Sequence, residues 1–131
     1  MIAMVDYGVG NLFSLKSSLA HLGLEAVVTA DPARLRAADR IILPGVGAFG
    51  DAMEKLTATG LVPVIKEEAR KKPLLGICLG MQLLFEKSYE YGEHQGLGFV
   101  KGQVCPLEPD LKDPALKVPH IGWNALHNLL D

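Results

Sequence analysis

Apolar runs alternate with helix-like segments over the first two thirds of the chain. Short runs of apolar residues predict four strands, at residues 1–5, 25–29, 40–43 and 73–77. The segments between them have the composition or apolar spacing of helices, at residues 12–22, 32–37, 48–56 and 61–72. Strands that alternate with helices predict an α/β fold, in which an open, mostly parallel sheet carries helices on both faces.

The strand predicted at residues 73–77 leads directly into Cys78. The motif there is Gly76-Ile77-Cys78-Leu79-Gly80, and residues 81–87 predict a helix. A reactive side chain between two glycines, on a sharp turn from strand to helix, is typical of a nucleophile elbow. The start of the helix also favours a thiolate over a thiol. A buried structural cysteine is the alternative, but the order of strand and helix favours a nucleophile.

A second loop is expected beside this elbow. Parallel strands end at the same edge of a sheet, so residues 44–47, after the third predicted strand, should lie near Cys78. We expect the backbone N–H groups of Leu79 and of Val46 or Gly47 to stabilise a developing oxyanion. An ordinary tight turn is the alternative interpretation of this loop.

The sequence offers no clear general base for Cys78. No histidine is followed by a carboxylate that would orient it as a triad base; the four are His21, His94, His120 and His127. We interpret each as a surface or interface histidine. Gln82, one turn beyond Cys78, is predicted to face the site and to hydrogen-bond a polar substrate. Cys105, beside Pro106, is predicted to be a packed thiol.

Composition and charge exclude several classes of function. A length of 131 residues fits one domain, and 49% hydrophobic with 21% charged residues is an ordinary balance for a globular protein. A net charge of −2 leaves no electrostatic footprint for nucleic acid or for a membrane surface. The two cysteines lack metal-ligand spacing, and no apolar stretch is long enough to cross a membrane. We therefore expect a cytoplasmic protein with reduced thiols, no metal and no cofactor.

The glycine pair Gly8 and Gly10 suggests a dinucleotide-binding loop. Phe13 stands where the third glycine of that fingerprint belongs, and no acidic residue follows the second predicted strand at the ribose position. This interpretation is therefore set aside.

The pattern changes after residue 87. Residues 88–98 predict a polar loop, and residues 99–104 alternate like an exposed strand. Four prolines then punctuate a loop-rich stretch, within which residues 117–124 predict an irregular strand with a polar and aromatic surface. The sequence stops in an apolar stretch, residues 129–131, without a cap or a sheet-closing strand.

Four motifs together resemble a known family. Residues 76–82 resemble the nucleophile motif of class I, triad-type glutamine amidotransferases. Three further stretches narrow the resemblance to the glutaminase subunits of imidazole glycerol phosphate synthase, at residues 5–12, 43–49 and 118–124. The resemblance runs from the first residue to the last, and it implies a three-layer, flavodoxin-like α/β fold.

The resemblance also implies a reaction. Cys78 would attack the side-chain amide of glutamine and form a glutamyl thioester, and water would then release glutamate. Gly45, Gly47 and Gln82 would bind the glutamine, while the backbones of Val46, Gly47 and Leu79 would form the oxyanion hole.

The ammonia would then reach a second protein. The resemblance implies a heterodimer in which a (β/α)₈-barrel cyclase subunit uses the ammonia to make imidazole glycerol phosphate in histidine biosynthesis. Asn11, Trp123 and Asn124 match positions expected to face this partner. A core tryptophan is the alternative for Trp123, and its polar neighbours favour an interface.

One family feature is missing. The family carries its catalytic His and Glu in a Phe-His-Pro-Glu-like motif near the C-terminus, and this sequence has no such motif. We therefore expect residues 1–131 to be the N-terminal portion of a single glutamine amidotransferase domain, with little or no turnover by itself. An open sheet edge and uncovered apolar surface should favour self-association.

Three alternatives stay open at this point. The chain could be another class I glutamine amidotransferase with a different ammonia acceptor. It could be a cysteine-dependent α/β-hydrolase, which also uses a Gly-x-nucleophile-x-Gly elbow. It could also be a non-catalytic module that only docks onto a partner, because a missing base is what such a module would have.

Overall fold

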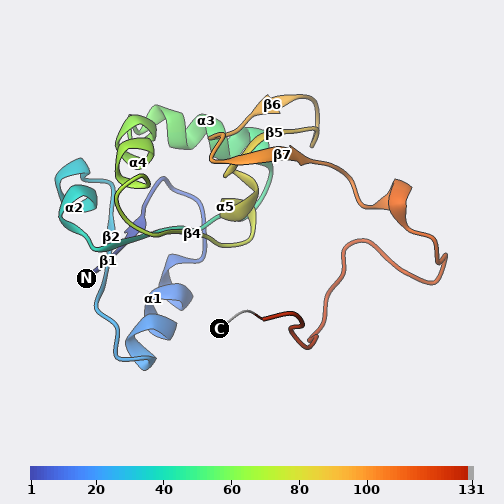
Figure 1. The fold of residues 1–131 in the computed structure, drawn as a ribbon, viewed down its shortest axis with the longest axis horizontal. Coiled ribbons are helices and arrows are strands. Elements are labelled where there is room, and N and C mark those ends of the chain that lie inside the picture. The colour runs from blue at the N-terminus through green and yellow to red at the C-terminus, as the bar shows by residue number, and fades with distance from the viewer. Residues whose placement is uncertain (130–131) are drawn as a thin grey trace.

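Four parallel strands form the central sheet of the protein (Figure 1). A computed structural model describes residues 1–129; Leu130 and Asp131, from the apolar end of the sequence, lie outside the described residues. The strand order is β2-β1-β3-β4. The strands are β1 (Ile2–Val5), β2 (Ala26–Thr29), β3 (Arg40–Leu43) and β4 (Leu74–Gly76). All four strand predictions and the parallel direction are confirmed.

Helices cover both faces of this sheet, as predicted. Figure 1 shows α1 on one side of the sheet and the next three helices on the other. The bounds are α1 (Leu12–His21), α2 (Pro32–Ala37), α3 (Phe49–Ala58) and α4 (Val62–Glu68). Two predicted ends are wrong: α3 continues through Thr57 and Ala58, and α4 stops before Lys72. Because a residue before proline is disfavoured in helical conformation, Lys72, which precedes Pro73, cannot readily extend α4.

Alternate residues of each strand face opposite layers, which explains why the strands are apolar throughout. Ala3 and Val5 of β1 belong to a large buried cluster, which lies on the face of the sheet that α2, α3 and α4 cover. Ile2 and Met4 belong to a smaller cluster with Leu19 of α1. The molecule is therefore a three-layer α/β structure, with its core on both sides of one sheet.

The helix predicted at residues 81–87 is present but wrong in its extent. Helix α5 (Leu79–Gln82) has one turn, and the chain then enters β5 (Phe85–Ser88). This strand lies in a second, three-stranded sheet between β6 (His94–Gln95) and β7 (Val100–Val104). Tertiary pairing on both sides of β5 therefore overrides its helical propensity. The exposed strand predicted at residues 99–104 is confirmed by β7, while β6 interrupts the predicted polar loop.

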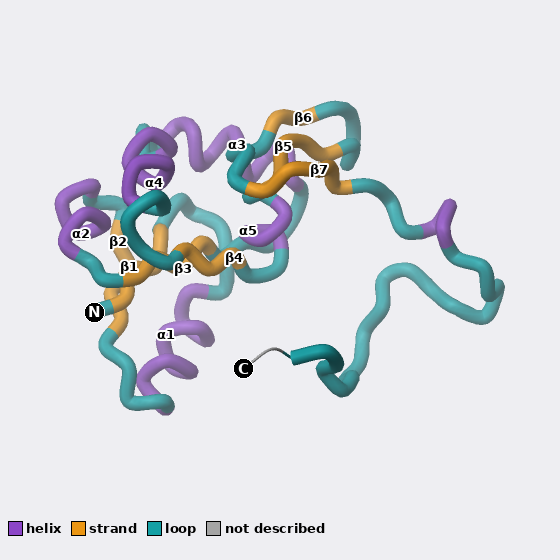
Figure 2. Tube along the Cα trace, in the orientation of Figure 1, coloured by secondary structure: helices purple, strands orange, loops and turns teal. Residues whose placement is uncertain are grey.

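Residues 105–129, the tail, have almost no regular structure. Figure 2 shows this part as loop apart from a short 3₁₀ helix, η1 (Glu108–Asp110). Every residue of the tail is exposed. The irregular strand predicted at residues 117–124 is wrong, because this stretch has no hydrogen-bonded strand neighbour within residues 1–129 and Pro119 cannot donate to a ladder.

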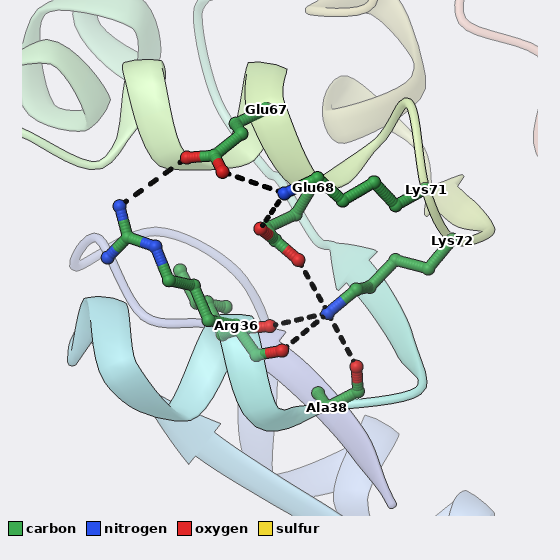
Figure 3. Close-up of polar contacts among 7 residues, drawn as sticks. Arg36, Ala38, Glu67, Glu68, Lys71 and Lys72 are labelled. Carbon is green, nitrogen blue, oxygen red and sulfur yellow. Dashed lines mark hydrogen bonds and ion pairs between the residues drawn. The ribbon is translucent and has the colours of Figure 1, made fainter.

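Lys72 joins the ends of α2 and α4 (Figure 3). Its ammonium donates to the carbonyl oxygens of Leu35, Arg36 and Ala38 at 3.2, 2.8 and 2.6 Å, and it pairs with Glu68 at 2.8 Å. The orphan carbonyls at the end of α2 are thereby satisfied by a cation. This contact fixes the chain immediately before β4, which leads to Cys78.

Candidate active site

Cys78 occupies a strained backbone conformation on the turn between β4 and α5. Its φ is 57° and its ψ is −120°. Within residues 1–129 only two other residues besides glycine have a positive φ. Such a conformation costs on the order of 1–3 kcal/mol and persists only where the surroundings impose it. The thiol is exposed, as a nucleophile elbow requires.

The two glycines of the elbow leave no room for a side chain. A Cβ on Gly76 would lie 2.6 Å from the Cα of Met81. A Cβ on Gly80 would overlap the carbonyl oxygen of Leu43. Both positions therefore require glycine, for the steric reason that the sequence indicated.

The donor loop, residues 44–47, lies directly against this elbow. The N–H of Ile77 donates to the carbonyl of Leu43 at 3.0 Å. A Cβ on Gly45 would lie 2.5 Å from the backbone nitrogen of Gly80, so the two backbones are in contact. The structure thus brings together the two loops that the sequence predicted to be neighbours.

Three backbone N–H groups at this junction are free to bind a ligand. Those of Val46, Gly47 and Leu79 donate to no acceptor within residues 1–129. Leu79 is the first residue of α5, where N–H groups have no partner inside the helix. Gly47 has a φ of 92°, which a residue with a side chain rarely adopts. These groups are the predicted oxyanion donors, and that role stays a prediction.

Tyr7 holds the first residue of the donor loop. Its hydroxyl donates to the carbonyl oxygen of Pro44 at 2.6 Å, and the side chain is 5% exposed. Burial raises the pKa of Tyr7 to about 12. The sequence pattern does not single out this residue; the available signal is an aromatic side chain within a glycine-rich turn.

Gln82 lines a cavity of about 590 Å³, and Cys78 is not among the residues that line it. The cavity lies among β5, the end of β7 and the tail, with Glu90 and Val118 on its wall. The carboxylate of Glu90 accepts a hydrogen bond from the N–H of Phe49 at 2.8 Å, where α3 begins. The sequence prediction did not include Glu90.

Cys105 also lines this cavity and is exposed. The prediction of a packed thiol is wrong, because the chain after β7 enters the tail and not the core.

A second cavity, of about 310 Å³, separates the loops that follow β1 and β3. Gly8 to Gly10 form one wall, and Val46 to Ala48, with Asp51 and Lys55 of α3, form the other. It lies where the strand order reverses, which is the usual ligand-binding position in open parallel sheets. Cys78 does not line this cavity either.

No histidine forms a hydrogen bond with Cys78 among the residues that the structure describes. His21 ends α1, and His94 packs against Gly50 of α3. In the tail, His120 makes a 2.6 Å contact with the side chain of Asn124, and His127 is exposed. Within residues 1–129, the site therefore contains a thiol and donors, and no histidine is hydrogen-bonded to the thiol.

The three residues predicted to face a partner are exposed in different places. The Asn11 side chain accepts a hydrogen bond from the N–H of Ser14 at 3.2 Å and caps α1. Trp123 is fully exposed in the tail, next to Asn124. Neither cluster of buried residues contains any of the three, and no hydrogen bond within residues 1–129 joins Asn11 to the other two.

Neither metal ligands nor a membrane span is found in the described part of the chain. No three His, Cys, Asp or Glu residues within it lie close enough together to bind an ion. No helix there has both the length and the apolar character needed to cross a bilayer.

Comparisons with known proteins show which family this chain resembles. The family model described as glutamine amidotransferase class-I matches residues 3–127. The chain is 54% identical over 127 residues to imidazole glycerol phosphate synthase subunit HisH of Sulfurimonas denitrificans, and 50% identical over 128 residues to that of Wolinella succinogenes. These matches cover 96% and 97% of the chain, which spans 61% and 62% of these relatives.

A solved glutamine amidotransferase has a similar fold. The TM-score is 0.67 at 23% sequence identity, and the match covers 80% of this chain and 56% of that one. At this identity the likeness concerns the fold, and it supports the flavodoxin-like, three-layer arrangement predicted from the sequence.

Proposed function

The chain belongs to the class-I glutamine amidotransferases, and from this membership we propose that Cys78 attacks the side-chain amide of glutamine. One observation carries the proposal: Cys78 has a positive φ at the turn between β4 and α5, beside the donor loop. A strained, exposed thiol with unpaired N–H groups nearby is the arrangement that acyl transfer through a cysteine requires.

The proposed reaction has two steps. The Cys78 sulfur bonds to the amide carbon of glutamine, the carbon–nitrogen bond breaks, and the thiol proton leaves with ammonia. Water then adds to the γ-glutamyl thioester and releases glutamate and the thiol. The N–H groups of Leu79, Val46 and Gly47 would stabilise the negative oxygen in both steps.

The glutamine itself would be held by groups on both sides of Cys78. We propose that Gly45 and Gly47 contact it through their backbones and that Gln82 contacts it through its amide. Residues 1–131 would act as one glutamine amidotransferase domain. Because no histidine hydrogen-bonds Cys78 within residues 1–129, we expect slow acylation and little sustained turnover from this chain by itself.

We further propose that the ammonia goes to a second subunit. Two relatives at 50% identity or more are named as subunits of imidazole glycerol phosphate synthase, and a (β/α)₈-barrel cyclase in histidine biosynthesis would be the acceptor. Asn11, Trp123 and Asn124 would contact it, and exposed aromatic side chains are frequent anchors of interfaces. Both cysteines are free thiols, which suits the cytoplasm, where we place the complex.

A glutamine-analogue chloroketone tests the proposed substrate. We expect it to alkylate Cys78 in the intact chain, and we expect glutamine to slow this alkylation more than asparagine does. Cys78→Ala removes the alkylated peptide and serves as the control. Equal protection by the two amino acids would contradict glutamine as the substrate.

The same experiment addresses the docking module. That alternative is favoured because no histidine hydrogen-bonds Cys78 in the described part of the chain. It predicts that Cys78 reacts with the chloroketone no faster than Cys105 does, while the chain still binds a barrel subunit in a pull-down. An acceptor other than the cyclase predicts alkylation of Cys78 without binding to that subunit.

A further inference from the structure

We propose that Tyr7 is a positioning residue for the oxyanion donors, and that its hydroxyl fixes the donor loop against the elbow. The inference rests on the proposed function, because it assigns a role in the same reaction. Tyr7 follows β1, whereas the donor loop follows β3, so two neighbouring strands of the sheet bring them together.

The hydrogen bond of Tyr7 is short and shielded from water. Its hydroxyl donates to the carbonyl oxygen of Pro44 at 2.6 Å, and the residue is 5% exposed. Within residues 1–129, no other side chain hydrogen-bonds the donor loop. The hydroxyl of Tyr7 is therefore the one side-chain group that hydrogen-bonds the loop within residues 1–129.

Fixing this carbonyl also fixes the direction of the next N–H. The peptide bond between Pro44 and Gly45 is planar and trans, so its C=O and N–H groups point in opposite directions. Because the carbonyl of Pro44 points at Tyr7, the N–H of Gly45 points away from it. Rotation of this peptide would move Val46 and Gly47, whose N–H groups are the predicted donors.

The opposite side of the loop is held by close backbone contact. Gly45 lies against the backbone of Gly80, with no room for a Cβ. A Cβ on Gly10 would lie 3.0 Å from the ring of Pro44, so the turn that contains Tyr7 also packs on the loop. Beyond this grip, Val46 is 52% exposed and Gly47 is in the left-handed region. The hydroxyl on Pro44 and the backbone contact of Gly45 are thus the last two points at which the loop is held before its donors.

Oxyanion donors act only when they lie at hydrogen-bond distance from the developing charge. We therefore expect Tyr7→Phe to leave the thiol intact and to misplace the donors. The variant loses one oxygen atom and keeps the aromatic ring that fills the space. Its effect should appear in reactions that generate an oxyanion and not in reactions that do not.

Two electrophiles separate these reactions in the intact chain. With a glutamine-analogue chloroketone, the thiolate adds to the carbonyl carbon and forms a negative oxygen that the donors can bind before chloride leaves. With iodoacetamide, the thiolate displaces iodide directly and no oxyanion forms. Each rate at Cys78 is followed by peptide mass spectrometry, and circular dichroism confirms folding. We expect Tyr7→Phe to slow the chloroketone about tenfold and to change the iodoacetamide rate less than about twofold.

Thr59→Ala is the matched control. The Thr59 hydroxyl donates to the carbonyl of Leu56 at 2.6 Å, but it lies at the far end of α3 and does not touch the donor loop. A general loss of stability would affect both variants alike, so the ratio of the two rates should change in Tyr7→Phe and not in Thr59→Ala.

The outcomes are distinguishable. An unchanged ratio in Tyr7→Phe, with selective alkylation of Cys78 in the wild type, would overturn the role of Tyr7 and leave the proposed function standing. Equal loss in both variants would also overturn it, because the effect would then be one of stability. A wild type in which the chloroketone shows no preference for Cys78 would overturn both proposals.

Discussion

The sheet and the tail place their apolar side chains in opposite ways. In the sheet layers, residues such as Val5, Leu43 and Phe49 are completely buried. In the tail, Ile121 and Trp123 are almost fully exposed. Packing within the chain therefore specifies the elbow and its donor loop, whereas no such packing specifies the tail within residues 1–129. Under the proposed function, the chain supplies the geometry for attack on glutamine, and the partner supplies the surface that the tail contacts.

The largest difference in stability between the two regions should appear when a glycine in each is replaced by alanine. Gly80→Ala places a Cβ on the carbonyl oxygen of Leu43, so we expect a loss of about 4 kcal/mol or a failure to fold. Gly122→Ala in the tail meets only His120, at 3.8 Å, and should change stability by less than about 0.5 kcal/mol. Urea denaturation measures the free energy of unfolding of both variants. Equal losses would contradict the view that packing specifies the elbow and not the tail.

The next largest effect is expected at Lys72, a partly buried charge. Lys72→Met leaves three carbonyl oxygens at the end of α2 without their donor, so we expect a loss of about 3 kcal/mol in the free energy of unfolding. Lys117→Met removes an exposed lysine of the tail and should be neutral within about 0.5 kcal/mol. A neutral Lys72→Met would show that the network in Figure 3 contributes little.

A smaller effect should appear as a loss of stability at high pH, through the hydroxyl of Tyr7. Burial raises the pKa of Tyr7 from 10.0 to about 12, so the folded state holds the proton more tightly than the unfolded state does. This contribution is complete below pH 10.0 and is lost as the pH rises to about 12. We expect a loss on the order of 2 kcal/mol over this range.

Denaturation as a function of pH isolates this contribution. Tyr7→Phe should lack this part of the pH dependence, while Tyr91→Phe, at an 87% exposed residue, should keep it. Superimposable profiles for the wild type and Tyr7→Phe would contradict the burial of this hydroxyl.

The smallest effect on stability is expected at Trp123. Because this side chain is fully exposed, Trp123→Ala should leave the free energy of unfolding unchanged within about 0.5 kcal/mol. Binding to a barrel subunit should weaken by about tenfold or more, as measured by calorimetry. Leu126→Ala, also in the tail, is the control for a general loss of apolar surface. A loss of stability in Trp123→Ala without a change in binding would assign this residue to the fold.

The sequence predicted most of the central sheet because its signals are local. Each strand is one short apolar run, and the glycines around Cys78 mark the elbow directly. The placement of the donor loop followed from topology alone, since parallel strands end at one edge. Self-association through an open sheet edge stays a prediction; β2 and β4 are the edge strands, and Leu75 of β4 is 55% exposed.

Features that depend on residues far apart in the sequence could not be predicted from local patterns. Residues 85–88 have helix-like composition, but β6 and β7 pair with them on both sides. The hydrogen bond from Tyr7 to Pro44 joins residues 37 positions apart, and no local pattern encodes it. Cys105 was assigned to packing from its apolar neighbours, although the tail that follows it is exposed.

The two cysteines provide the most direct test of the central claim, because both are exposed and each belongs to one of the two regions. The wild-type chain is treated with a glutamine-analogue chloroketone and, separately, with iodoacetamide, and the rate at each cysteine is measured by peptide mass spectrometry. We predict that the chloroketone prefers Cys78 over Cys105 by about a hundredfold more than iodoacetamide does, because only Cys78 has oxyanion donors beside it. The same preference with both reagents would contradict the assignment of Cys78 as the nucleophile of a formed glutamine site.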